Sequence, residues 1–366
     1  MNIGIIGLGL IGGSIAKTLK KVHSQNSYII GYDTNPLFLD AALESGTLDK
    51  AALEIGADFA KCNVIFICTP ISYTTELVRK LVPHVSGDCI ITDICSTKYN
   101  LIKEIEGIAE ISNKNLYFVG GHPMCGSEKS GYFASTDYLF ENAYYMLTPM
   151  ADTPNFIVFI LQKLIERLGA IPLIITPSYH DFATATVSHL PHIIASGLVH
   201  LVKNNDGNNH YLHTLAAGGF KDITRIASSN PKIWHDICVS NKDEIQKIFK
   251  RYIDILNDFS IYLESNDDEA IYNYFDSARS YRDTFNEGIN SELVKNYTIF
   301  VDAKDEPGII ASIATLLSSH GINIKDIGIM NHREFACGVL RIALANKSCM
   351  IDAHQILSKH NYTIYY

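Results

Sequence analysis

The sequence predicts a Rossmann-like α/β domain over residues 1–170, an all-helical domain over 171–292 and a small ferredoxin-like α+β domain over 296–366. In the first part, strand-like runs alternate with helical patterns, which is typical of a parallel sheet covered by helices. Strand signals disappear from about residue 180 and return near residue 297 in the order β-α-β-β-α-β, the ferredoxin-like arrangement. A chain of 366 residues is long enough for two or three domains.

The first domain is predicted to begin with a strand almost at its first residue. The apolar run NIGII is followed by a glycine turn, a helical pattern and a second strand that ends at Asp33. Further buried strands are predicted over 64–70, 89–96 and 116–123. Helices are predicted over 36–54 and 72–82. This order favours a parallel sheet with helices on both faces.

The turn after the first strand has the pattern G-x-G-x-x-G, formed by Gly7, Gly9 and Gly12. The first glycine permits a tight turn, the second lets a pyrophosphate approach the backbone, and the third lets the helix pack closely. Asp33 ends the next strand, where an acid accepts hydrogen bonds from a ribose 2′-hydroxyl, so NAD is expected rather than NADP. The predicted cofactor-binding residues are Gly7, Leu8, Gly9, Leu10, Ile11, Gly12, Asp33, Thr69 and Pro70.

The segment 120–131, GGHPMCGSEKSG, has too much glycine and proline for a regular helix or a central strand. We therefore expect a shaped loop that holds His122 in one position. Ser96 and Thr69 also follow predicted strands, and open α/β sheets bind ligands at the carboxyl ends of their strands. These residues should share one crevice. The alternatives are a structural histidine at His122 and a helix N-cap at Ser96.

The middle domain contains two pairs of polar residues at helical spacing. His189 and His192 lie on one helix face, which suits a polar pair facing an anionic ligand. No metal is expected there, because we find no convincing third ligand. Asp222 and Arg225 have the same spacing, and an arginine held by an aspartate suits a carboxylate. A surface ion pair is the alternative. Helices are predicted over 188–203, 230–237 and 241–264.

Composition limits the partners of the protein. Its net charge is −9 without a long basic run, which argues against nonspecific nucleic-acid binding. No stretch approaches the roughly 20 apolar residues of a transmembrane helix, so no membrane is expected as a partner. The eight cysteines form no C-x-x-C pattern and no signal peptide is recognised, which predicts reduced thiols and a cytoplasmic location.

Five segments occur in an order that resembles the prephenate dehydrogenase family: GLGLIGGS, TDICSTK, GGHPMCGSEKSG, SHLPH and GGFKDITRIA. The resemblance covers roughly residues 1–290. It implies an NAD-dependent enzyme of tyrosine biosynthesis that converts prephenate to 4-hydroxyphenylpyruvate with loss of CO2. It also implies that His122 accepts the proton of the substrate's ring hydroxyl and that Ser96 orients the imidazole.

The same resemblance implies a substrate-binding set. Arg225, held by Asp222, would bind a substrate carboxylate, the two histidines of the helical domain would line the pocket, and Glu128 would shape its side-chain end. The full set is Arg225, Asp222, His189, His192, Ser188 and Glu128.

The C-terminal segment resembles an ACT domain, a module that commonly binds amino acids. DEPGIIASIATLLSSHGINI has an acidic-Pro-Gly turn before a helix and Gly-Ile-Asn-Ile entering a strand. An aromatic effector is expected, with tyrosine first and phenylalanine or tryptophan as alternatives. A purely structural role also stays open. The expected effector residues are Gly308, Ile309, Asn323 and Ile324. A homodimer formed through the helical domain is expected.

Two other functions stay open. Arogenate keeps the ring carboxylate but has an amino-acid side chain, so Arg225 cannot distinguish an arogenate dehydrogenase from a prephenate dehydrogenase. A sensor that binds a dinucleotide and an amino acid without catalysis is the second alternative. The presence of His122, Ser96 and Arg225 argues against the sensor.

Overall fold

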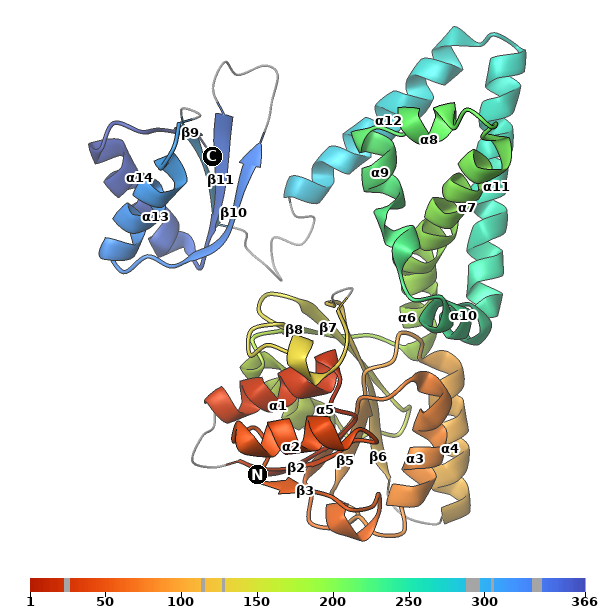
Figure 1. Ribbon diagram of the computed structural model, residues 1–366, viewed down its shortest axis with the longest axis vertical. Helices are drawn as coiled ribbons and strands as arrows, with labels where there is room; N and C mark the ends of the chain where they lie inside the picture. Colours follow the sequence, from red (N-terminus) through yellow and green to blue (C-terminus); the bar gives the residue numbers. More distant parts are fainter. Residues whose placement is uncertain are drawn as a thin grey trace. The chain divides into compact units, whose positions relative to one another are not determined.

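The structure is a computed structural model that describes residues 1–22, 27–112, 116–126, 129–287, 297–303, 306–330 and 338–365. These residues form two compact units, Met1–Ile255 and Leu256–Tyr366. The boundary between the units lies within helix α11 (Lys242–Glu264). Each unit is described by itself (Figure 1).

The first unit contains an eight-stranded sheet in the order β3-β2-β1-β4-β5-β6-β7-β8. Strands β1 to β6 are parallel, β7 is antiparallel to β6, and β8 is parallel to β7. The strands are β1 Asn2–Ile6, β2 Tyr28–Tyr32, β3 Lys50–Ala51, β4 Val64–Ile67, β5 Ile90–Asp93, β6 Tyr117–Pro123, β7 Tyr144–Pro149 and β8 Ile171–Ile174.

Helices cover both faces of this sheet because its central strands are apolar on both sides. Along β4, Val64 and Phe66 belong to one core cluster, and Ile65 and Ile67 belong to the other, as the two-residue period of a strand requires. One face packs against α1 (Leu10–Val22), α2 (Pro36–Glu44) and α5 (Asn155–Arg167). The other packs against α3 (Ile71–Leu81) and α4 (Tyr99–Ser112) (Figure 1).

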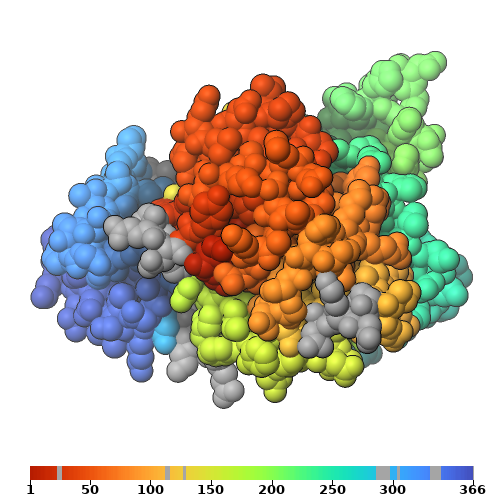
Figure 2. Space-filling model, turned by 90° about the horizontal axis from the view of Figure 1, so that it is seen from below, coloured from red at the N-terminus to blue at the C-terminus, as the bar shows by residue number. Residues whose placement is uncertain are grey.

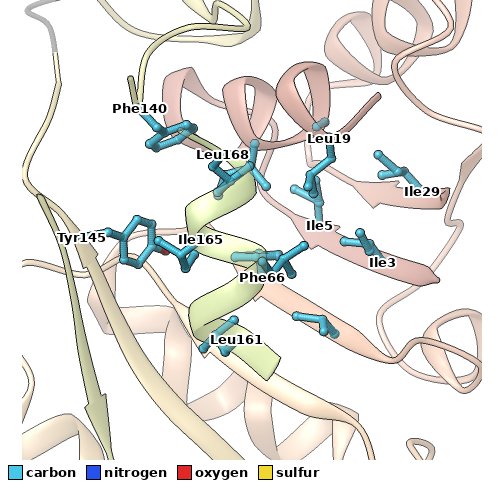
Figure 3. Close-up of a cluster of buried hydrophobic side chains, with 14 of the residues drawn as sticks. Ile3, Ile5, Leu19, Ile29, Phe66, Phe140, Tyr145, Leu161, Ile165 and Leu168 are labelled. Carbon is cyan, nitrogen blue, oxygen red and sulfur yellow. The ribbon is translucent and has the colours of Figure 1, made fainter. Parts of the chain in front are cut away.

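Helix α5 places its apolar face on the sheet. Figure 3 shows Leu161 and Ile165 on the side of α5 that faces Phe66 and Tyr145. Two short 3-10 helices, η1 (Ala57–Phe59) and η2 (Tyr132–Ala134), complete this part of the chain. Seen from below, the red to yellow-green segments form one continuous surface (Figure 2), as expected when helices bury a sheet.

Strand β6 confirms the strand predicted over 116–123, and the loop predicted over 120–131 begins only after Pro123. Residues 120–123 belong to β6, and His122 lies opposite Met146 of β7. Glycine occupies these positions because neighbouring groups leave no room for a Cβ atom. A Cβ on Gly120 would be 2.3 Å from Thr148 Oγ1, and one on Gly121 would be 2.4 Å from the Asp93 carbonyl oxygen. The chain leaves the strand only after Pro123.

The helical part of the chain follows β8. It contains α6 Pro177–Thr184, the π-helical η3 Ala185–His189, α7 Leu190–Asn205, α8 Tyr211–Leu215, α9 Gly218–Thr224, the 3-10 helix η4 Arg225–Ser228, α10 Pro231–Ser240, α11 and α12 Asp268–Glu287. Asn230 caps α10, since its side chain accepts a hydrogen bond from the backbone N–H of Lys232.

One helical run corrects the expectation that no stretch reaches the length of a transmembrane helix. Pro177–Asn205, which comprises α6, η3 and α7, is long and apolar enough to cross a membrane by length and composition alone. His180, Asp181 and His189 are buried in this run, and Asp181 is hydrogen-bonded to the start of α4. We therefore interpret the first part of the run as part of the core, while much of α7 is exposed.

The second unit contains a four-stranded antiparallel sheet in the order β10-β11-β9-β12. After the end of α11 and α12, its elements are β9 Tyr297–Ala303, α13 Ile309–Ser319, β10 Ile324–Met330, β11 Gly338–Leu344, α14 Lys347–Lys359 and β12 Thr363–Tyr365. Both helices contribute to the core on the sheet, for example through Ile313 and Leu357. The predicted β-α-β-β-α-β order and the predicted fold class are confirmed.

The predicted limits of the three domains, 1–170, 171–292 and 296–366, stay predictions. The large sheet includes β8, which begins one residue after the predicted limit at 170.

Candidate active site

A cavity of about 520 Å³ lies at the carboxyl ends of the parallel strands. Its wall is formed by residues that follow β1, β4 and β5, by the end of β6, and by α10. His122 and Ser96 both line it, together with Ile11, Thr69 and Pro70. The structure therefore brings together both residues that the sequence predicts for catalysis.

A second cavity, of about 590 Å³, shares Cys68, Thr69 and Pro70 with the first. Gly7, Gly9 and Asp33 line it. Two adjoining cavities, one at the glycine turn and one at His122, suit the two ends of a dinucleotide.

The glycine turn has the geometry that a dinucleotide site requires. Gly7 has a φ of +95°, and a Cβ on Gly12 would lie 2.0 Å from the Gly7 carbonyl oxygen. Around Gly9 there is no heavy atom within 4 Å of where a Cβ would be, so its backbone is open to a ligand. Asp33 Oδ2 accepts a hydrogen bond from Leu8 N at 2.6 Å, which ties the second strand to the turn. Leu8 itself is a core residue.

His122 is the end of a buried chain of hydrogen bonds. His122 Nδ1 lies 2.8 Å from His180 Nε2, and His180 Nδ1 lies 2.7 Å from Asp181 Oδ1. His180 and Asp181 are buried at the start of the long helical run. Burial, and next electrostatic interactions with His180 and with the Lys98 ammonium, hold the pKa of His122 well below its ordinary value of 6.5. At neutral pH the imidazole is therefore uncharged.

The hydrogen-bond partners fix which ring nitrogens carry protons. A carboxylate can only accept, so His180 Nδ1 donates to Asp181. Burial keeps the pKa of His180 low as well, so its other nitrogen is an acceptor, and His122 Nδ1 donates to it. His122 Nε2 is then left with the free lone pair that a general base needs.

Asp181 also holds the loop that contains Ser96. Its two carboxylate oxygens accept hydrogen bonds from the backbone N–H groups of Lys98 and Tyr99, at 2.8 and 2.9 Å. Asp181 thus caps α4 from a distant part of the chain. Since α4 begins at Tyr99, the half-buried Ser96 is not the capping residue, and that alternative is wrong.

A buried ion pair lies at the end of β5. Lys98 and Asp93 are both fully buried, and the lysine ammonium donates to Asp93 Oδ2. Asp93 Oδ1 accepts a hydrogen bond from Gly121 N at 3.0 Å, in the residue before His122. The pair therefore anchors the strand that presents the candidate base.

His189 is buried and has a defined tautomer. Asn241 Nδ2 donates to the Asp181 carbonyl oxygen at 2.8 Å, which fixes the orientation of the amide. The same nitrogen lies 3.1 Å from His189 Nδ1, so this ring atom is an acceptor and the proton is on Nε2. Burial lowers the pKa of His189 to about 4, so it is neutral at physiological pH.

His192 is on the same run but has a different neighbour. Its ring stacks on Trp234 of α10, with centroids 3.5 Å apart and planes within 11°. Neither His189 nor His192 lines the two cavities described above. Within the described ranges, no group of three histidine, cysteine, aspartate or glutamate side chains is placed to hold a metal.

Of the remaining predicted substrate residues, three do not line the His122 cavity, and one lies outside the described residues. Arg225 and Asp222 are exposed on η4 and α9, and Ser188 is half-buried in η3. None of the three lines the cavity that contains His122. Glu128 lies outside the described residues.

Sequence reasoning missed His180, Asp181 and Asn241. His180 and Asp181 are adjacent in an otherwise ordinary helical segment, and Asn241 separates two helices, so no spacing links them to His122. The segment DICSTK contains both Asp93 and Lys98, so the buried ion pair could have been predicted from this segment.

The chain matches three family models. They are the prephenate dehydrogenase nucleotide-binding domain over residues 15–173, the prephenate dehydrogenase dimerization domain over 176–277, and the ACT domain over 297–334. The prephenate dehydrogenase of Bacillus subtilis is 36% identical over 367 residues, which is 100% of this chain and 98% of the relative. The chain belongs to the prephenate dehydrogenase family. The prephenate dehydrogenase of Lactococcus lactis is 33% identical over 360 residues, 98% of each chain.

Solved structures of this family resemble this chain. The prephenate dehydrogenase from Aquifex aeolicus, in complex with hydroxyphenyl propionate and NAD+, has a TM-score of 0.71 and 32% identity, and the match covers 78% of this chain and 98% of that one. The arogenate dehydrogenase of Synechocystis has a TM-score of 0.70 and 28% identity, with 78% and 100% covered. The predicted family and its C-terminal ACT domain are confirmed.

As a family member, the chain carries a dimerization domain and an ACT domain. In the ACT domain, Gly308 has a φ of +92° and directly precedes α13, whose first residue is Ile309. Asn323 is exposed just before Ile324 opens β10. A positive φ is costly for other residues, so Gly308 permits the turn into α13.

Proposed function

We propose that this protein is an NAD-dependent prephenate dehydrogenase, which oxidatively decarboxylates prephenate to 4-hydroxyphenylpyruvate. The observation that carries the proposal is the neutral His122, which lines the cavity at the strand ends and has a free Nε2 lone pair. Membership in the family supplies the reaction class. The glycine turn, Asp33, Thr69 and Pro70 would hold NAD+.

The chemistry needs a base for the ring hydroxyl. His122 Nε2 accepts the hydroxyl proton, and the hydrogen bond from His122 Nδ1 to His180 strengthens as the imidazolium forms. Asp181 then stabilises the positive charge through His180. When bound, NAD+ supplies the hydride acceptor, and loss of CO2 leaves an aromatic ring.

The other predicted residues have supporting roles. Ser96 lines the cavity beside His122, where its hydroxyl would orient the substrate hydroxyl and the imidazole. Arg225, with Asp222, would bind a substrate carboxylate, and Glu128, Ser188, His189 and His192 would shape the pocket around it.

The partners follow from the same family. Prephenate is the proposed substrate rather than arogenate, because the relatives at 36% and 33% identity are both named prephenate dehydrogenases. Tyrosine is the proposed effector of the ACT domain, held near Gly308, Ile309, Asn323 and Ile324. We also propose a homodimer formed through the helical domain, a cytoplasmic location, and the three domains 1–170, 171–292 and 296–366.

An absorbance assay for NADH tests this function. With saturating NAD+, the purified protein should form NADH from prephenate, and the rate should fall when tyrosine is added. Phenylalanine and tryptophan serve as effector controls. Faster turnover of arogenate would favour the alternative substrate, and no turnover of either would favour the non-catalytic sensor. If no aromatic amino acid changes the rate or binds in calorimetry, the ACT domain is structural.

A further inference from the structure

One wall of the His122 cavity is formed by α10 and contains a single cation. Asn230, Lys232, Ile233, Asp236 and Ile237 contribute to this wall. Among the described residues that line the cavity, Lys232 is the one lysine or arginine. The remainder of the lining consists of apolar and uncharged polar groups, apart from Asp236.

The position of α10 is fixed at both ends. The Asn230 side chain caps its first turn, and Trp234 stacks on the buried His192. At the other end, Ser240 Oγ accepts a hydrogen bond from Thr97 Oγ1 at 3.0 Å, in the loop that contains Ser96. The helix therefore holds Lys232 at the cavity even though the lysine side chain is exposed.

The two charges on this wall are in different situations. Asp236 Oδ1 lies 3.0 Å from His235 Nδ1, so the acid has a partner. Lys232 Nζ has no hydrogen bond or ion pair with any residue in the described part of the chain. The proposed substrate has two carboxylates, and an ammonium on the cavity wall that pairs with none of the described residues is placed to bind one of them.

We propose that Lys232 binds the side-chain carboxylate of the substrate and selects the keto acid prephenate over the amino acid arogenate. The inference rests on the proposed function. With the ring hydroxyl at His122, the ring carboxylate of prephenate and the side chain that carries the second carboxylate are both attached to the opposite ring carbon. The α10 wall, which contains Lys232, can then contact the side-chain carboxylate. Arogenate has an ammonium next to the same carboxylate, and a lysine in the same cavity repels it.

The experiment compares kcat/KM for prephenate and for arogenate in the full-length enzyme and in its Lys232→Met, Lys232→Glu and Lys232→Arg variants. Lys232→Met should lower kcat/KM for prephenate about 3- to 10-fold, mainly by raising KM, and should change kcat/KM for arogenate less. Lys232→Glu should lower kcat/KM for prephenate further and shift the ratio of the two kcat/KM values toward arogenate. Lys232→Arg should keep the ratio of the parent enzyme. Lys250→Met is the matched control, because Lys250 is an exposed lysine of α11 that lines neither cavity.

The outcomes separate this inference from the proposed function. If the parent enzyme oxidises neither substrate, the proposed function fails. If the parent oxidises prephenate and the Met and Glu variants keep its ratio of the two kcat/KM values, Lys232 has no part in selection and the function stands. A larger KM for NAD+ with an unchanged substrate ratio would assign the lysine to the cofactor and overturn the inference.

Discussion

At the scale of single residues, the state of His122 is set by groups outside the cavity. Asp181 determines the tautomer of His180, and His180 determines that of His122. The sequence predicts that His122 and Ser96 share a crevice, because both follow strands whose carboxyl ends meet at one edge. It could not predict His180, because a contact across 58 residues leaves no local pattern.

Removing His180 tests this chain of hydrogen bonds. His180→Phe should lower kcat about 10- to 100-fold with a smaller change in KM, because the imidazolium on His122 loses its acceptor. His180→Gln should retain more activity than the phenylalanine variant, since its side-chain oxygen can accept from His122 Nδ1. Steady-state kinetics at neutral pH measure both, and His200→Phe, on the exposed side of α7, is the control. Equal activity of the Phe and Gln variants would argue that the ring only fills space.

At the scale of elements, the sequence predicts most strands and helices of the first domain, and the difference at β6 is instructive. Glycine and proline usually interrupt strands, so composition predicts a loop from residue 120, although a strand is also predicted to reach residue 123. Here the glycines are required by packing, because β5 and β7 lie too close for a side chain. Such a requirement depends on residues far away in the chain, so local composition cannot show it.

Gly121→Ala should therefore destabilise the first unit. The new Cβ would meet the Asp93 carbonyl oxygen, a backbone atom that cannot move without displacing β5. We expect a loss of about 1–3 kcal/mol in the free energy of unfolding, measured by urea denaturation. Gly126→Ala is the matched control, because nothing lies within 4 Å of its Cβ position. Equal stability of the two variants would show that β6 has room for a side chain.

At the scale of the whole molecule, the sequence predicts the fold class because each part has its own pattern of strands and helices. It does not predict that several buried histidines gather beside the cavity that His122 lines. Burial lowers the pKa of His122, His180, His189 and His192. All four must therefore stay neutral in the folded protein.

This cluster predicts a loss of stability in mild acid. A histidine whose pKa is lowered by folding binds more protons in the unfolded state. Its contribution to the free energy of unfolding is therefore complete above pH 6.5 and is lost as the pH falls toward the pKa of the folded state. His189, with a pKa of about 4, accounts for about 3 kcal/mol at pH 4. Urea unfolding of the first unit between pH 7 and 4.5 measures the effect. The slope of the free energy of unfolding against pH should be smaller in His189→Gln. An equal slope in that variant would show that His189 does not contribute to the loss.

The most direct test of the account is the pH dependence of kcat/KM in the parent enzyme and in His122→Asn. The parent should lose activity only as pH falls below 6.5, because the pKa of His122 is lowered and its protonated form cannot act as a base. His122→Asn should lower kcat by roughly 10²- to 10⁴-fold and remove this acid limb, while the dissociation constant of NAD+ stays the same. Near-parental turnover in the variant, or an acid limb that it keeps, would contradict the assignment of His122 as the base.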